Sequence, residues 1–194
     1  MFLSLAGTIV TVAIVLLVVI LIVAVISCYN KLVQLRNKVK NAWSQIDVQL
    51  KRRFDMIPNL VETVKGYASH EESIFGEFAK ARGLYAQASQ SGSVEGMAEA
   101  NKGLSGALSR LLMVQEKYPE LKANSNFQTL MNELTETEDK ISYTRQFYND
   151  VVLKYNNKVE MFPGNIIASM FNFKIAEYFN VTDEAERKAP QVKF

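Results

Sequence analysis

The sequence predicts an all-α protein, in which an N-terminal transmembrane helix continues into a long-helix antiparallel four-helix bundle with a short C-terminal helical segment. Residues 1–30 contain no Asp, Glu, Lys or Arg, and beyond them apolar residues recur at spacings of three and four. Gly and Pro number only 9 and 4 in 194 residues, which argues against a strand-rich or disordered domain. The predicted parts are an anchor (1–30), a bundle (31–163), a short apolar membrane-proximal helix (164–180) and a polar tail (181–194).

The anchor is predicted from one apolar run. Residues from Ile9 to Ile26 are apolar except for Thr11, and a helix of about 20 such residues crosses roughly 30 Å of hydrocarbon. A cleaved signal peptide fits less well, because a positively charged start is missing and the apolar core is longer than in such peptides. Cys28 is the only cysteine, so an internal disulfide is excluded.

The basic residues after the anchor predict its orientation. Between Lys31 and Ala68 there are eight Lys and Arg residues against three Asp and Glu residues. The positive-inside rule then places the N-terminus outside and the bundle in the cytoplasm, with a single pass through the membrane. The residues nearest the bilayer would also attract anionic lipid, by about 1 kcal/mol each; they are Lys31, Arg36, Lys38 and Lys40. A net charge of +2 is too small to indicate nucleic-acid binding.

The first soluble helix is predicted to continue directly from the anchor to about Tyr67. Its apolar residues form one stripe: Leu32, Leu35, Val39, Ala42, Trp43, Ile46, Leu50, Phe54, Ile57, Leu60, Val61 and Val64. Pro58 lies inside this pattern, where a helix loses a hydrogen bond. A kinked helix and two abutting helices both fit, and the kinked helix is favoured because the stripe keeps its phase.

Two shorter helices are predicted next. Ser69 and Glu72 have the spacing of a capping box, which starts a helix that runs to about Ser89. A turn follows over residues 90–93, and a third helix then ends at Pro119.

A fourth helix is predicted from Phe127 to Phe162, ended by the Pro-Gly pair that follows. If it runs antiparallel to the first helix, Arg53 should pair with Glu138 and Asp47 with Arg145. The four side chains Asp47, Arg53, Glu138 and Arg145 would then form a polar layer that fixes helix register. A charged ligand or a proton site is the functional alternative.

The segment after this helix is strongly apolar and should lie near the bilayer. Three interpretations remain open for it: a closing helix packed on the bundle, aromatics inserted at the lipid interface, or a contact with another subunit. The candidate contact residues are Ile166, Ile167, Met170, Phe171, Phe173, Tyr178 and Phe179. The tail over 181–194 has little to bury and is expected to be loosely held.

Catalytic chemistry is not indicated. His70 is the only histidine, so the sequence lacks clustered ligands for zinc and the inward Glu-x-x-His pairs of a carboxylate metal centre. Neither a Gly-rich phosphate loop nor a nucleophile elbow is present. We therefore predict no enzyme activity, no catalytic residue, no metal and no cofactor.

The chain resembles the bacterial LemA family in the runs over 29–37, 42–53 and 57–67, and also over 118–123, 137–149 and 162–165. The resemblance extends over nearly the whole chain. It implies a small protein of the bacterial cell (inner) membrane, with one N-terminal span and a helical bundle. Family members have no agreed biochemical activity. Their genes often lie near one for a membrane metalloprotease of envelope quality control, which suggests an envelope role by association only.

Two function classes follow. The first is a membrane scaffold that self-associates into a homo-oligomer through residues 166–179 and the basic residues near the bilayer. The second is an adaptor or regulator of a membrane partner, such as an envelope quality-control metalloprotease. An adaptor would bind through the bundle tip at 89–93 or through the small-residue stretch at 94–106.

Overall fold

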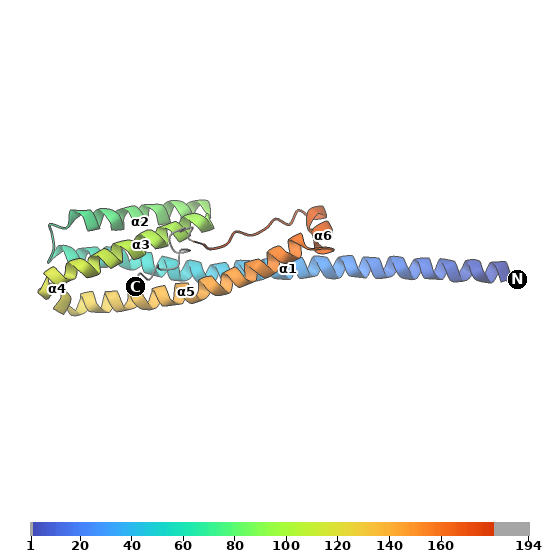
Figure 1. The fold of residues 1–194 in the computed structure, drawn as a ribbon, viewed down its shortest axis with the longest axis horizontal. Coiled ribbons are helices and arrows are strands. Elements are labelled where there is room, and N and C mark those ends of the chain that lie inside the picture. The colour runs from blue at the N-terminus through green and yellow to red at the C-terminus, as the bar shows by residue number, and fades with distance from the viewer. Residues whose placement is uncertain (1, 181–194) are drawn as a thin grey trace, which may run out of the picture. The chain divides into compact units, whose positions relative to one another are not determined.

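The computed structural model describes residues 2–180, and all regular structure in that range is helical (Figure 1). The predicted tail over 181–194 lies outside the described residues. The helices are α1 (Phe2–Lys65), α2 (Glu72–Ser91), α3 (Val94–Val114), the 3-10 helix η1 (Gln115–Lys117), α4 (Pro119–Ala123), α5 (Ser125–Glu160) and α6 (Gly164–Met170).

The chain forms two compact units, and α1 and α5 each contribute residues to both. Unit 1 takes the residues up to Asn41 together with Asp150–Ala176. Unit 2 takes Ala42–Asn149 together with the described residues from Glu177 to Asn180.

Helix α1 is continuous through Pro58, so the interpretation as two abutting helices is wrong. Proline removes one backbone hydrogen bond from a helix interior. Ile57 and Leu60, on either side of Pro58, are both fully buried. Apolar burial on both sides therefore holds the helix together across the lost bond.

The turn between α2 and α3 uses different caps from those predicted. Helix α2 begins at Glu72, and Glu71 at its N-cap makes no side-chain capping bond, so the predicted capping box is wrong. At the other end Gly92 adopts a left-handed φ of 68°, a conformation that glycine adopts without strain. Ser93 then caps α3, because its Oγ accepts a hydrogen bond of 3.0 Å from the backbone N–H of Gly96.

The connection to α5 contains a further short helix. Helix α3 ends at Val114, and Pro119 begins α4 instead of simply ending a helix. Proline suits a first helical position, where its missing N–H costs nothing. Asn124 Oδ1 accepts a 2.9 Å hydrogen bond from the N–H of Phe127, so α5 starts at Ser125, ahead of the predicted start.

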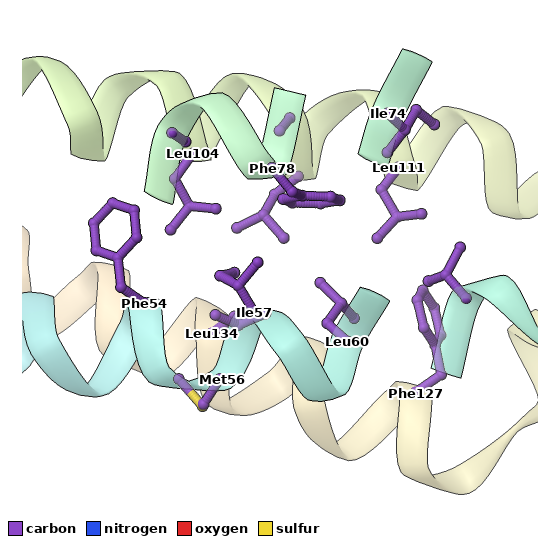
Figure 2. Packing of buried hydrophobic residues seen from close by; sticks show 14 of the residues in the cluster. Phe54, Met56, Ile57, Leu60, Ile74, Phe78, Leu104, Leu111, Phe127 and Leu134 are labelled. Atoms are coloured by element: carbon purple, nitrogen blue, oxygen red, sulfur yellow. The ribbon is translucent and has the colours of Figure 1, made fainter. Parts of the chain in front are cut away.

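Unit 2 is held by one apolar core to which α1 to α5 all contribute, and α2 and α3 lie side by side (Figure 1). Figure 2 shows the α1 side chains facing those of α2, α3 and α5. The large side chains of this core are Phe54, Ile57, Leu60, Ile74, Phe78, Leu104, Leu111, Leu121, Phe127 and Leu134. Burying each contributes about 1.5–3 kcal/mol. The ring of Phe54 also stacks on that of Tyr85 at 4.2 Å between centroids.

The C-terminal segment is helical only as far as Met170, so the helix predicted over 164–180 is too long. Residues 173–180 have no regular secondary structure. Asn172 breaks the helical path with a φ of 54°, and the N–H of Phe173 donates a 2.8 Å hydrogen bond to the Ala168 carbonyl. After Phe173, hydrogen bonds from side chains of α5 hold the segment.

Candidate functional site

The N-terminal part of α1 exposes its apolar side chains. The large apolar residues between Val12 and Ile26 are 39–66% exposed, and none of the most apolar stretch is buried within the described chain. By length and composition this helix can cross a membrane. A surface of this kind is stable only when something apolar covers it.

The four basic residues predicted to flank the bilayer, Lys31, Arg36, Lys38 and Lys40, are all exposed on α1. The Arg36 guanidinium carbon lies 5.0 Å from the centroid of the Phe173 ring, which is a cation–π contact within unit 1. Arg36 is exposed to solvent in spite of this contact, so its guanidinium can meet other groups from the side that faces away from the ring.

The predicted contact residues after α5 separate into two sets. Ile167, Phe173 and Phe179 are buried within the chain, at 6%, 8% and 1% exposure. The second set is exposed: Ile166 at 50%, Met170 at 69%, Phe171 at 50% and Tyr178 at 37%. The segment thus packs back on its own chain through one set, and only the other is free to contact lipid or another protein.

In unit 1, Tyr29 and two residues of α5 hold this segment. The Tyr29 ring lies 4.8 Å from that of Phe171 and 5.7 Å from that of Phe173. Tyr155 Oη donates a 2.8 Å hydrogen bond to the Lys174 carbonyl. Burial raises the pKa of Tyr155, an effect that Arg36 partly offsets.

Asn156 completes the attachment in unit 1. Its side-chain amide donates a 2.9 Å bond to the Ala176 carbonyl and accepts a 2.8 Å bond from the Ala176 N–H. One buried asparagine thereby satisfies both backbone groups of a residue that has no partner in a helix or sheet.

In unit 2, Tyr148 and Asn149 hold the next residues in the same way. Tyr148 Oη donates a 2.8 Å hydrogen bond to the Glu177 carbonyl, and Asn149 Oδ1 accepts a 2.9 Å bond from the Phe179 N–H. The buried Phe179 ring lies 6.0 Å from Trp43, whose ring also contacts Tyr148 at 5.6 Å. Burial, with a smaller contribution from Glu177, raises the pKa of Tyr148 to about 12.

A signal for this arrangement was present in the sequence. The pair Tyr-Asn occurs at 148–149 and again at 155–156, seven residues apart and therefore on one face of a helix. Read as part of an apolar stripe, the tyrosines look like ordinary core residues. The asparagine after each tyrosine adds an amide that can both donate and accept, as backbone groups of an extended chain require.

The polar layer contains one of the two expected pairs. Arg53, 2% exposed, forms an ion pair with Glu138, whose side chain is 40% exposed. The same guanidinium donates to Asn101 Oδ1 and, at 3.2 Å, to Ser105 Oγ. Asn101 Nδ2 lies 3.4 Å from Glu138 Oε2. Burial lowers the pKa of Arg53, while Glu138 raises it.

Asp47 and Arg145 are not brought together, and the described part of the chain contains no ion pair between them. Arg145 is exposed, whereas Asp47 is half-buried and contributes, after burial, to raising the pKa of Tyr85 on α2. The negative charge of Asp47 therefore acts on Tyr85 of α2. The antiparallel alignment predicted which residues of α1 and α5 lie at the same height along the two helices. It did not predict on which side of its helix each residue lies.

A metal site is not visible in the described residues. Across residues 11–180, no group of three or more His, Cys, Asp and Glu side chains is placed to hold a metal ion. Two buried polar atoms there have no hydrogen-bond partner, Gln49 Oε1 and Arg53 Nε, both on α1 and four residues apart.

These features define a class: an all-helical protein whose first helix is long and apolar enough to cross a membrane and continues into a packed helical unit. The LemA family model matches residues 42–194, so the chain belongs to the LemA family.

Several curated proteins are similar. Magnetosome protein MamQ 2 of Paramagnetospirillum magneticum is 29% identical over 174 residues, covering 78% of this chain and 64% of that protein. Magnetosome protein MamQ of Magnetospirillum gryphiswaldense is 25% identical, with the same coverage of the two chains. Protein LemA of Metamycoplasma hominis is 24% identical over 156 residues, covering 79% of this chain and 69% of that protein. The present chain spans somewhat less than two thirds of the length of the magnetosome relatives.

Proposed function

We propose that this protein is a membrane-anchored scaffold that self-associates at the cell envelope and carries out no catalysis. The proposed arrangement is an antiparallel four-helix bundle in the cytoplasm, held to the bacterial inner membrane by a single span with its N-terminus outside. The observation that carries the proposal is the continuity of α1, because one helix contains both an exposed apolar stretch and residues of the core of unit 2.

An exposed apolar surface on unit 2 supports self-association. Val48 on α1 is 62% exposed, and Tyr143 and Phe147 on α5 are 74% and 47% exposed. Val48 and Thr144 line a shallow groove between the two helices. Tyr143 and Phe147, four residues apart, share the face of α5 beside this groove. Aromatic side chains exposed in this way are enriched in protein interfaces.

Crosslinking in intact membranes tests this surface. A photo-crosslinking amino acid at Tyr143 should give a ladder of self-adducts. In the same chain, Phe147→Lys should abolish the ladder, because it would bury a charge at the contact. Thr135→Lys, on an exposed part of the same helix, is the matched control and should leave the ladder intact. Equal ladders from both variants would reject this surface as the site of association.

The alternative function, an adaptor for a membrane partner such as an envelope protease, is favoured by a groove on the other side of unit 2. The groove has a volume of about 660 Å³ and lies between α2 and α3. Its lining contains small residues, which include Ala81, Gly103 and Gly106, and charged residues of both signs, with Glu99 and Lys102 among them. Small residues of this kind let a partner helix approach closely.

The two functions give different products with two probes. A crosslinker at Tyr143 that yields self-adducts, with none from Glu99, fits the scaffold. A crosslinker at Glu99 that yields one foreign protein in stoichiometric amount fits the adaptor. Labelling of Ser91→Cys by an impermeant thiol reagent in intact cells, in a chain carrying Cys28→Ser, would contradict the cytoplasmic assignment.

A further inference from the structure

The segment from the end of α5 through α6 exposes several large apolar side chains. Their exposed fractions are Met161 64%, Phe162 79%, Ile166 50%, Met170 69% and Phe171 50%. The sequence from 161 to 173 contains no charged residue, although Glu160 precedes it and Lys174 follows it. We call the surface formed by these five residues the apolar foot.

The apolar foot is exposed, but poor packing of the turn is not the reason. Within α6, Ile167 is 6% exposed and Ala168 is 2% exposed, so the helix has a definite buried face. Gly164 is also buried, and a Cβ there would overlap the Lys158 carbonyl oxygen. The turn is tightly built, and its opposite face is apolar in spite of facing away from the core.

The position of the foot in unit 1 is fixed by aromatic contacts. The Phe171 ring lies 4.8 Å from the ring of Tyr29 on α1, and α6 lies beside α1 (Figure 1). Tyr29 follows Ile26, the last residue of the apolar run, by three residues, which is about 4.5 Å along a helix. The foot therefore lies at the level where the apolar surface of α1 ends.

We propose that the apolar foot inserts into the headgroup and acyl-chain boundary of the same bilayer that α1 crosses, giving the protein a second contact with lipid. The foot and the apolar part of α1 belong to one compact unit, so one apolar medium covers both. Aromatic and aliphatic residues at such a boundary are typical of membrane-interface segments. The proposal rests on the membrane-anchoring part of the proposed function and is independent of self-association.

The charges around the foot fit the same placement. Arg36 is seven residues beyond Tyr29 on α1, about 10 Å farther along the helix, and its guanidinium lies over Phe173. Lys31 and Lys38 are also exposed at this end of α1. Cations at this level would contact lipid phosphates while the foot contacts the upper acyl chains.

Tryptophan fluorescence in vesicles tests the insertion. Trp43 is the only tryptophan, so Trp43→Phe gives a silent full-length background. Into it we would place Met170→Trp, with Ile166→Trp as a second reporter on the foot. The matched control is Lys154→Trp, exposed on α5 in the same unit and seven residues before Met161. Val18→Trp reports on the span itself.

The probe is a phosphatidylcholine vesicle whose lipids carry bromine either just below the headgroup or near the chain end. An interfacial segment lies about 5–10 Å deep, so shallow bromines should reduce the foot signals about twofold and deep bromines should reduce them less. Lys154→Trp should be unaffected by either. Val18→Trp should be quenched most by deep bromines.

Three results would overturn the inference. If the foot reporters respond no more than Lys154→Trp while Val18→Trp is quenched, the foot does not touch lipid although the anchor stands. If Val18→Trp is also unaffected, the anchor and the foot are both rejected. Foot emission that shifts to the blue only as protein concentration rises would show instead that a second copy covers this surface, which also rejects the lipid contact.

Discussion

Replacing only Glu138, the acidic partner of Arg53, should lower the free energy of unfolding more than replacing both members of this ion pair. In Glu138→Leu the guanidinium, 2% exposed, loses its negative charge and keeps only Asn101 Oδ1 and Ser105 Oγ. Breaking a fully buried ion pair costs about 3–5 kcal/mol. Because the Glu138 side chain is 40% exposed and two neutral acceptors remain, we expect about 2 kcal/mol here.

The double variant Arg53→Met with Glu138→Leu removes the buried charge as well. It also removes Arg53 Nε, which has no hydrogen-bond partner in the described structure. An apolar pair of similar volume in such a place is often neutral or stabilising. We therefore expect the double variant to lie within about 1 kcal/mol of the wild type and to be more stable than Glu138→Leu alone.

Urea unfolding of the full chain in detergent, followed by the fluorescence of Trp43, measures these differences in unit 2. Trp43 is a suitable reporter because its ring contacts Tyr148 and Phe179 in the folded state. The control is Lys140→Leu, which removes an exposed ion pair with Glu136 and should change the free energy of unfolding far less than Glu138→Leu does. If the double variant is less stable than Glu138→Leu, the polar layer stabilises the fold through more than charge compensation, and the reasoning fails.

Two further predictions concern the C-terminal attachment and the turn. The raised pKa of Tyr148, about 12 against about 10 when unfolded, means that its contribution is complete below pH 10 and is lost as the pH rises towards 12. Tyr148→Phe should cost about 1 kcal/mol at neutral pH, through the lost bond to the Glu177 carbonyl, and should flatten that alkaline decline in urea titrations; an unchanged decline would assign it to another group. Gly164→Ala should lower the thermal midpoint seen by circular dichroism by the equivalent of about 2 kcal/mol or more, because the new methyl would overlap the Lys158 backbone. Gly106→Ala, in open space on α3, should raise stability by about 0.5–1 kcal/mol, and a similar loss in both variants would contradict the steric explanation.

The long elements of this fold could be predicted from periodicity. The stripe through Ile57 and Leu60 keeps its phase across Pro58, and α1 is indeed one helix there. Local rules were less reliable at the ends. Ser69 and Glu72 have capping-box spacing, yet α2 starts at Glu72 without a side-chain cap. A capping motif is short enough to occur by chance, whereas a stripe of many residues is not.

The candidate site was predicted only in part. Arithmetic on an antiparallel pair of helices matched Arg53 with Glu138, which form an ion pair, but also Asp47 with Arg145, which do not. The sum of two residue numbers gives a level along the helices and carries no information about rotation around them. Asn101, the third member of the Arg53 cluster, comes from α3 and was outside that arithmetic altogether.

The sequence by itself determined the helical class, the apolar helix and the family, because each depends on composition or on spacing along one chain. Only the tertiary structure decided which aromatic side chains of the C-terminal segment are buried. Phe173 and Phe179 are buried and Phe171 is half-exposed, although the sequence gives no reason to treat the three rings differently. The difference comes from the Tyr-Asn pairs of α5, whose side chains form hydrogen bonds with the backbone of this segment. Such bonds join residues 19 to 30 positions apart, and only the folded chain brings them within reach.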